Sequence, residues 1–367
     1  MKTYKGISTA LIAAMIAATA AGCSGGNTQE SDSTAVSTTA QSEAQESEST
    51  PESQSETEAA ASLPEGQMYS FLTGEPVDSS IGMQRPVAVM INNIEEATSQ
   101  QCGTSAADIL YEAVVEGNIT RLMAIFQDTS KIERVGSVRS ARHNYLDFAS
   151  NYDAIYCHYG QSIYATNKIQ QEGLLTVSEN VGSAYFQDNT YPAPHHIFAS
   201  GETLEAGISQ IGAGRNLPDG YEGGLVFNTE DTDPDYGTIA NNVSIPFVYS
   251  KSTLEYDSAT KLYKKYQYGA PHVDANNNEQ LTFKNIIIQY AQYADIPGGS
   301  GCQDITLYGE GKGIYITDGK AVDITWERSD GSVPTTYYIE DGTQLKINPG
   351  KTYIAVVPEN FNITLGE

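Results

Sequence analysis

The sequence predicts a mixed α/β and β protein, with an α/β N-terminal subdomain followed by a β-rich, mainly antiparallel C-terminal subdomain. In the first half, short apolar runs alternate with segments whose apolar residues recur at helical spacing. In the second half, short runs are separated by Asp-Gly turns, which is typical of antiparallel hairpins. We therefore predict a first subdomain at 64–212, a Gly-, Asp- and Asn-rich loop or linker at 213–243, and a second subdomain at 244–367.

The first subdomain is predicted to open with a buried strand followed by a helix. Residues 87–91 are continuously apolar, which predicts a strand covered on both faces. Residues 106–115 carry apolar side chains at helical spacing, with Ser105 as a plausible N-cap and Gly117-Asn118 as the stop. The same patterns predict the remaining elements, which are strands at 119–126, 135–138 and 154–159 and helices at 140–149 and 162–171.

The second subdomain contains short runs rich in aromatic and β-branched residues, which favour strands. Three of the turns between them carry Asp-Gly, at 318–319, 330–331 and 341–342. The predicted strands lie at 245–249, 253–256, 263–268, 284–290, 314–317, 322–326, 335–339 and 353–357.

The first 22 residues read as a lipoprotein signal peptide. Lys2 and Lys5 give a positive start, and the apolar run at 7–21 is shorter than the ~20 residues that span a bilayer. Small residues directly before Cys23 resemble a lipobox, where cleavage leaves this cysteine at the N-terminus. The thiol of Cys23 then accepts diacylglycerol as a thioether, and further acylation, such as palmitate, makes the attachment to the bilayer lasting. The sequence therefore predicts a lipid-anchored protein on the extracytoplasmic face of the cell membrane.

Residues 23–63 are predicted to form a disordered tether. The stretch after Cys23 has eight acidic residues, no basic residue and no apolar periodicity. The whole chain has a net charge of −26, from 46 acidic and 20 basic residues. This charge repels nucleic acid and anionic lipid headgroups, so we expect no nucleic-acid partner and a need for the covalent anchor.

Three cysteines remain after lipidation, namely Cys102, Cys157 and Cys302. They allow one disulfide at most, and a Cys102–Cys157 bridge is one pairing that the sequence allows. Cys157 lies in an apolar run and is expected to be a small buried residue. Adjacent strand residues point to opposite faces, so Cys157 and His158 are not expected to act together as nucleophile and base.

Candidate site residues gather where strands and helices are predicted to end. We expect Glu112 and Glu116 on one helix face, Arg121 at a strand start, and Arg139 and Arg142 at a strand–helix junction. A helix N-terminus with two arginines can bind an anion, since guanidinium groups pair with carboxylate or phosphate in a bidentate manner. His158 and His195 are the nearby histidines. The alternative is that the arginines only neutralise Glu112, Glu116 and Asp108 in a structural ion-pair network.

Two other chemistries are weaker. A zinc site would have to combine residues that lack any zinc-binding spacing, namely His158, His195, His196, His272 and Asp274. Sugar cleavage by Glu112 or Glu116 is conceivable, although two glutamates one helical turn apart are usually a solvated or paired face. The sequence predicts no metal and no cofactor.

The same residues carry a resemblance to the YerB-like lipoproteins, a bacterial family without an assigned biochemical function. The resemblance covers about residues 70 to 365 and implies an N-terminal and a C-terminal subdomain. The matching segments are 85–93, 107–113, 115–121, 135–142, 153–156 and 193–195 in the first half, and 269–274, 285–289, 311–313, 325–326 and 348–350 in the second.

Our leading hypothesis from the sequence is a non-enzymatic surface protein that binds an anionic cell-envelope component, such as a wall glycopolymer or a peptidoglycan stem. One alternative is an envelope enzyme acting on wall-polymer or pyrophosphate-linked substrates. Another is a scaffold for a membrane protein partner. The oligomeric state stays open.

Overall fold

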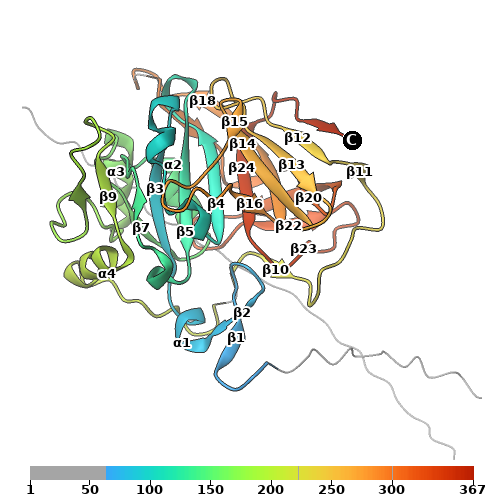
Figure 1. Ribbon diagram of the computed structural model, residues 1–367, viewed down its shortest axis with the longest axis horizontal. Coiled ribbons are helices and arrows are strands. Elements are labelled where there is room, and N and C mark those ends of the chain that lie inside the picture. The colour runs from blue at the N-terminus through green and yellow to red at the C-terminus, as the bar shows by residue number, and fades with distance from the viewer. Residues whose placement is uncertain (1–62, 222, 300) are drawn as a thin grey trace, which may run out of the picture. The chain divides into compact units, whose positions relative to one another are not determined.

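A computed structural model describes residues 63–221, 223–299 and 301–367 (Figure 1), which form one compact unit. The predicted signal peptide, Cys23 and all of the predicted tether except Leu63 fall outside the described residues. Within the described part of the chain, no helix combines the length and the apolarity that crossing a membrane requires.

The centre of the fold is a ten-stranded mixed sheet to which both halves of the chain contribute (Figure 1). Its strand order is β11 (Thr238–Ile239), β21 (Lys320–Arg328), β20 (Gly309–Thr317), β17 (Asn285–Ala291), β24 (Thr352–Pro358), β4 (Ile109–Val114), β5 (Thr120–Phe126), β3 (Val87–Asn93) and β7 (Ile155–Cys157), with β22 (Thr336–Ile339) paired to β21. The halves meet where β24 and β4 pair in parallel, between Thr352–Val356 and Ile109–Ala113. The central strands are buried on both faces, which explains their continuous apolar runs.

A second sheet covers part of one face of the first. Its order is β15 (Ala270–Pro271), β14 (Leu262–Gln267), β13 (Thr253–Asp257), β12 (Asn242–Ser244) and β25 (Thr364–Gly366), with β16 (Thr282–Phe283) paired to β14. Its apolar side chains, among them Val243, Leu254 and Phe283, pack into one core with Ile286, Ile288 and Ile316 of the large sheet.

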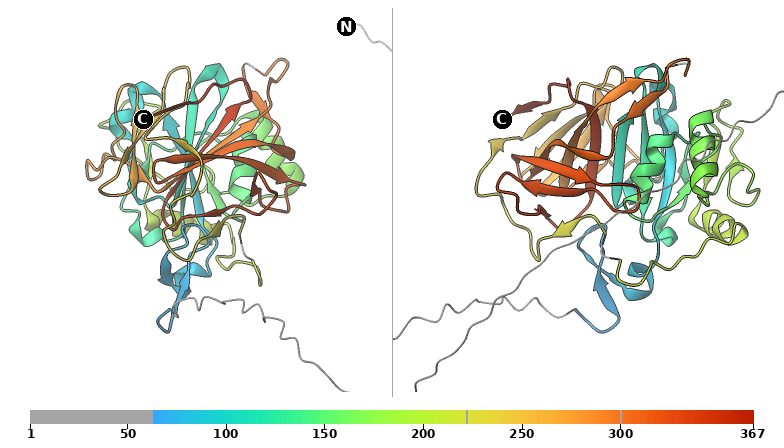
Figure 2. Two further views of the ribbon diagram at one scale, coloured as in Figure 1. Left: turned by 90° about the vertical axis from the view of Figure 1, so that its right-hand side faces the viewer. Right: turned by 180° about the vertical axis from the view of Figure 1, so that it is seen from behind.

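All the α-helices of the described residues lie in the N-terminal half, namely α1 (Ser79–Gly82), α2 (His143–Ser150), α3 (Ile163–Glu172) and α4 (Gly201–Gln210). Helices α2, α3 and α4 are the green segments on one side of the large sheet in Figure 2. Tyr145 and Phe148 of α2 pack on the face of the large sheet opposite the second sheet. The remaining strands form small sheets, namely β1 (Gln67–Tyr69) with β2 (Pro76–Asp78), β10 (Val226–Phe227) with β23 (Lys346–Ile347), β18 (Tyr293–Asp295) with β19 (Gln303–Ile305), and β6 (Val135–Gly136) with β9 (Ile197–Ala199) and β8 (Phe186–Gln187).

The fold is mostly β, so the α/β prediction for the N-terminal half holds only in part. The helix predicted at 106–115 is wrong, because this segment forms β4 between β5 and β24. Its apolar run is buried on both faces of the sheet, and for such a run periodicity does not distinguish strand from helix. Helices α2 and α3 lie close to their predicted ranges, and Ser162 caps α3 by accepting a hydrogen bond from the Ala165 amide. The strand predicted at 245–249 is shifted, since β12 ends at Ser244 and residues 248–250 form a turn.

Candidate functional site

Three of the predicted arginines converge in the N-terminal half. Arg121 is the second residue of β5 and lies opposite Asn92 of β3. Arg139 and Arg142 lie in the segment that joins β6 to α2, and Arg142 is the residue before the first turn of α2. Glu116 lies in the turn between β4 and β5. We call Arg121, Arg139, Arg142 and Glu116 the arginine cluster.

Glu116 pairs with two of the three arginines. Its carboxylate accepts from Arg121 Nη2 at 3.2 Å and from Arg142 Nε at 2.7 Å, and it also contacts Arg142 Nη2. Burial alone would raise the pKa of Glu116, but the hydrogen bonds from Arg142 and the charge of Arg121 outweigh it and lower that pKa to about 2. Glu116 is therefore ionised at neutral pH, and the predicted structural ion pairs exist for Arg121 and Arg142.

Arg139 differs from its two neighbours. Its Nη1 donates to the Pro194 carbonyl at 3.1 Å, and among the described residues no carboxylate pairs with it. Burial and the charge of Arg142 lower its pKa, as they lower the pKa of Arg121 to about 10, so both guanidinium groups stay protonated at neutral pH. Arg139 is thus a half-buried cation that forms no ion pair with a carboxylate of the described residues, although the charge of Glu116 acts on it from a distance.

His195 lies at the edge of the arginine cluster. Asn92 Nδ2 donates to His195 Nδ1 at 2.8 Å, and Pro194, the carbonyl partner of Arg139, directly precedes this histidine. Burial and the positive charge of Arg139 lower the pKa of His195 and outweigh the opposing charge of Glu96. The ring is therefore neutral at pH 7. The structure therefore places His195 beside Asn92 and Pro194, at the edge of the cluster.

His158 is placed differently from the prediction. Its side chain is fully buried, and both ring nitrogens have partners, the Gly160 carbonyl at 2.8 Å and the Thr176 hydroxyl at 3.0 Å. Burial lowers the pKa of this ring, so it is neutral. Because its hydrogen bonds are satisfied within the fold, His158 has no group left to offer a ligand.

Glu112 is also not a ligand-facing residue. It lies on strand β4 rather than on a helix, so it shares no helix face with Glu116. Both Glu112 and Lys265 have side chains with 0% exposure, and they form an ion pair of 3.2 Å. The Glu112 carboxylate accepts further hydrogen bonds from Asn93, Thr120, Ser250, Ser252 and Tyr353. The prediction of Glu112 as a site residue is wrong. Strand β4 is buried along its whole length, so its glutamate lies in the core, where no ligand reaches it.

Sequence reasoning missed two residues near the arginine cluster. Tyr156, on β7, is 2% exposed, and its hydroxyl has no hydrogen-bond partner among the described residues. Burial raises the pKa of Tyr156, and the charges of Arg121 and Arg142 oppose that rise. Asn92 was visible as a polar end to an apolar strand, but its role depends on the register between β3 and β5, which the sequence does not contain.

The residues weighed for other chemistries are not gathered into a site. Within the described part of the chain, no group of three or more His, Cys, Asp or Glu side chains is arranged to hold a metal ion. Asp274 accepts hydrogen bonds from the amides of Gly103 and Ser105, which is a structural role. Cys102, Cys157 and Cys302 are all free thiols. Burial raises the pKa of Cys102 to about 12 and raises that of Cys157 as well, so both are unreactive thiols.

A β-rich fold in which two sequence halves share one sheet defines the structural class of this protein. Within that class, the chain belongs to the family described as "Protein of unknown function (DUF3048)", whose N-terminal domain matches residues 72–213 and whose C-terminal domain matches residues 243–354. The predicted resemblance to the YerB-like family is therefore confirmed.

Two comparisons show how far the similarity extends. The chain is 31% identical over 299 residues to "Putative lipoprotein YerB" of Bacillus subtilis (strain 168), which covers 78% of this chain and 86% of that protein. The crystal structure of the YerB protein from Bacillus subtilis is similar in fold, with a TM-score of 0.70 and 28% identity. That match covers 81% of this chain and 99% of the other chain.

Proposed function

We propose that this chain is a lipoprotein, anchored by acylated Cys23 to the extracytoplasmic face of the membrane, that binds an anionic component of the cell envelope at the arginine cluster. The lipid anchor is supported by the signal-like sequence before Cys23 and by the name of the YerB relative. The binding role is supported by one observation above all, which is the unneutralised charge of Arg139.

The charge balance of the cluster supports an anionic ligand. Three guanidinium groups stand against the single carboxylate of Glu116, which leaves a formal excess of two positive charges in a chain of net charge −26. An isolated excess of this kind in a strongly acidic protein attracts anions locally, because partly buried charges are screened less than exposed ones.

Two further features of the cluster suit an anion. Arg142 precedes α2, and this helix has no side-chain N-cap and no acidic residue in its first turn, so a negative charge near this end would be favourable. The Nε atoms of Arg121 and Arg139 are buried and lack hydrogen-bond partners among the described residues. A carboxylate or phosphate beside them would provide the missing acceptors.

The test is a pull-down of cell-wall fragments by the purified full chain. Arg139→Gln removes the unneutralised charge and leaves the Glu116 pairs intact. We expect it to weaken retention about 10- to 100-fold, because a hydrogen bond to a charged group contributes about 1.5–3 kcal/mol. Fragments stripped of their phosphate polymers separate a phosphate ligand from a carboxylate one.

Lys131→Gln is the matched control, since it removes one positive charge from a side chain that is 66% exposed. It should bind like the unchanged protein. If the Arg139→Gln variant folds normally and retains wall fragments as well as the unchanged chain does, the binding proposal is wrong.

A further inference from the structure

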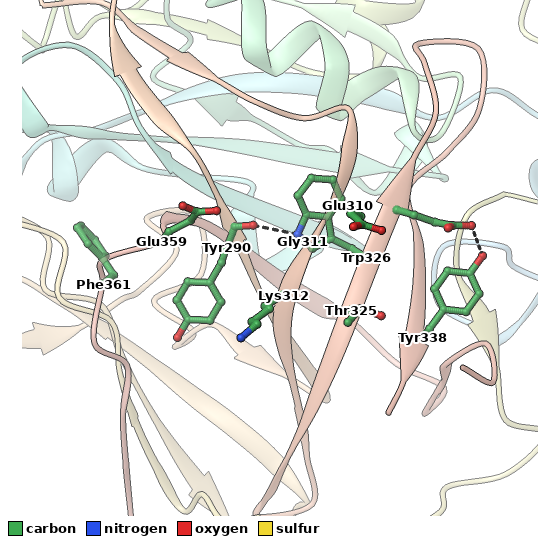
Figure 3. A pocket seen from close by; sticks show the side chains of 10 residues that line it. Tyr290, Glu310, Gly311, Lys312, Thr325, Trp326, Tyr338, Glu359 and Phe361 are labelled. Carbon is green, nitrogen blue, oxygen red and sulfur yellow. Dashed lines mark hydrogen bonds between the residues drawn. The ribbon is translucent and has the colours of Figure 1, made fainter. Parts of the chain in front are cut away.

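A hollow of about 790 Å³ lies on the part of the large sheet that the C-terminal half of the chain forms (Figure 3). It is far along the chain from the arginine cluster. Strands β17, β20, β21 and β22 form its floor, and Glu359 and Phe361, which follow β24, form one side. Its volume falls within the roughly 300–1,000 Å³ that small-molecule sites occupy.

The register of the strands explains where this hollow comes from. Ile314 and Ile316 of β20 face the core under the second sheet, and Lys312 and Glu310 continue the same face by alternation. Where the second sheet no longer covers the strands, the face therefore changes from apolar to charged. Lys312 lies opposite Thr325, and Thr325 lies opposite Tyr338, so these side chains form a row across three strands.

Negative charge exceeds positive charge in the hollow. Glu310 and Glu327 are direct cross-strand partners, and like charges in that position destabilise a sheet. Glu359 adds a third carboxylate, and Lys312 is the only cation among the lining residues. Over residues 63–367 as described, none of these four side chains forms an ion pair. A formal charge of −2 in the hollow is therefore left without a partner.

Aromatic side chains surround these carboxylates. Tyr290, Tyr338 and Phe361 are half-buried, and the Tyr338 hydroxyl donates to Glu327 Oε1 at 2.5 Å, which fixes that carboxylate (Figure 3). Trp326 lies on the opposite face of the same strands, and its indole donates to the Tyr290 carbonyl at 2.9 Å. Gly311 lets the indole lie close to the floor, since a Cβ at this position would be 2.6 Å from the ring.

We propose that this hollow binds an alkylammonium group, such as the side chain of a lysine or another diamino acid in a peptide. The carboxylates would neutralise the ammonium group, and the aromatic rings would contact both its charge and its aliphatic chain. A neutral sugar would also contact the rings, but it would leave the Glu310–Glu327 repulsion unrelieved. This second binding site is independent of the arginine cluster.

The hollow has its own reporter, because Trp326 is the only tryptophan in the chain. The full chain, purified in detergent, is titrated with acetyl-Lys-Lys-amide while tryptophan fluorescence is recorded, and calorimetry provides an independent measurement. The peptide acetylated on both Nε atoms and N,N′-diacetylchitobiose are titrated in parallel. We expect saturable binding of the charged peptide only, and weaker binding at higher salt.

Three variants decide the class of ligand. Glu310→Gln and Glu327→Gln should each weaken binding about two- to fivefold, which is the effect of a partly exposed charge pair. Lys312→Gln should strengthen binding, because it removes the competing cation. Glu202→Gln on α4 makes the same charge change at an exposed position outside the hollow and should have no effect.

Two results would overturn the proposal. One is equal binding of the acetylated peptide or of the sugar. The other is a Lys312→Gln variant that binds less well while both glutamine variants bind normally, which would indicate an anionic ligand. Far-UV circular dichroism of each variant establishes that its fold is unchanged, so a null effect counts against the ammonium site.

Discussion

Charged residues of this protein occur in two different settings, either in a buried ion pair or without a partner of opposite charge. Glu112 and Lys265 form an ion pair that solvent does not reach, whereas Arg139 remains half-buried without a carboxylate. Burial lowers the pKa of Lys265 even with Glu112 beside it, whereas the charge of Lys265 and the surrounding hydrogen bonds outweigh burial and lower the pKa of Glu112. Breaking such a pair from one side typically costs about 3–5 kcal/mol. We therefore place Glu112 in the core and keep Arg139 as the residue proposed for recognition.

Glu116 should give the fold a measurable pH dependence. Its pKa is about 2 in the folded state against 4.5 ordinarily, so the stability it contributes is complete above pH 4.5 and is lost as the pH falls toward 2. The full shift corresponds to at most about 3 kcal/mol, and less in practice because the side chain is 27% exposed. In urea unfolding from pH 2 to 7, Glu116→Gln should be less stable than the unchanged chain above pH 4.5, and the difference should shrink toward pH 2.

The exposed Glu133 provides the comparison for this measurement. Glu133→Gln should follow the unchanged chain across the whole pH range. A Glu116→Gln difference that is constant with pH would mean that the arginines do not hold the carboxylate in the ionised form.

At the scale of elements, the parallel pairing of β24 with β4 determines whether the two halves of the chain unfold together or separately. Strand β24 comes from the last residues of the chain, yet it lies between β17 and β4. Val356 of β24 is fully buried and lies opposite Ala113 of β4. Because one strand completes the hydrogen bonding of both halves, we expect the halves to unfold together.

Val356→Ala tests this expectation. It should lower the stability by about 2 kcal/mol, as other losses of buried methyl groups do. Urea unfolding followed by Trp326 fluorescence, which reports on the C-terminal half, should shift by the same amount as unfolding followed by far-UV circular dichroism. Val333→Ala, at a side chain that is 37% exposed, should leave both curves in place. Two separate transitions would show that the halves are independent domains.

The whole molecule is strongly negative and has two local charge clusters of opposite sign. The arginine cluster carries excess positive charge, and the hollow on the C-terminal sheet combines excess negative charge with aromatic rings. Envelope peptides and polymers contain both ammonium and anionic groups, so the two proposed sites suit different parts of such material. The proposed covalent anchor would keep a protein of this charge at a membrane that would otherwise repel it.

The anchor itself can be tested in cells. Cys23→Ser removes the proposed acylated thiol, so the protein should move from the membrane fraction to the soluble fraction. Cys302→Ser changes a free, half-buried thiol of the folded part and should leave the protein in the membrane fraction. Retention of the Cys23→Ser variant in membranes at the unchanged level would rule out lipidation as the means of attachment.

The sequence alone was sufficient for features that depend on neighbouring residues. Helix α3 follows from local spacing and from its Ser162 cap, and the β20–β21 hairpin follows from Asp318-Gly319, where both residues have positive φ. The arginines at the strand–helix junction were visible for the same reason. Family membership was also readable, because long strings of residues carry it.

The tertiary structure alone decided which of two charged neighbours is buried in the core and which pairs with arginines at the surface. Glu112 and Glu116 are four residues apart, yet one lies inside a strand covered on both faces and the other at its open end. The partners that decide their roles, Lys265 for Glu112 and Arg142 for Glu116, lie 153 and 26 residues away along the chain. Packing of the second sheet on the large sheet brings Lys265 to Glu112, and the segment that leads into α2 brings Arg142 to Glu116. Local sequence patterns carry no record of that packing.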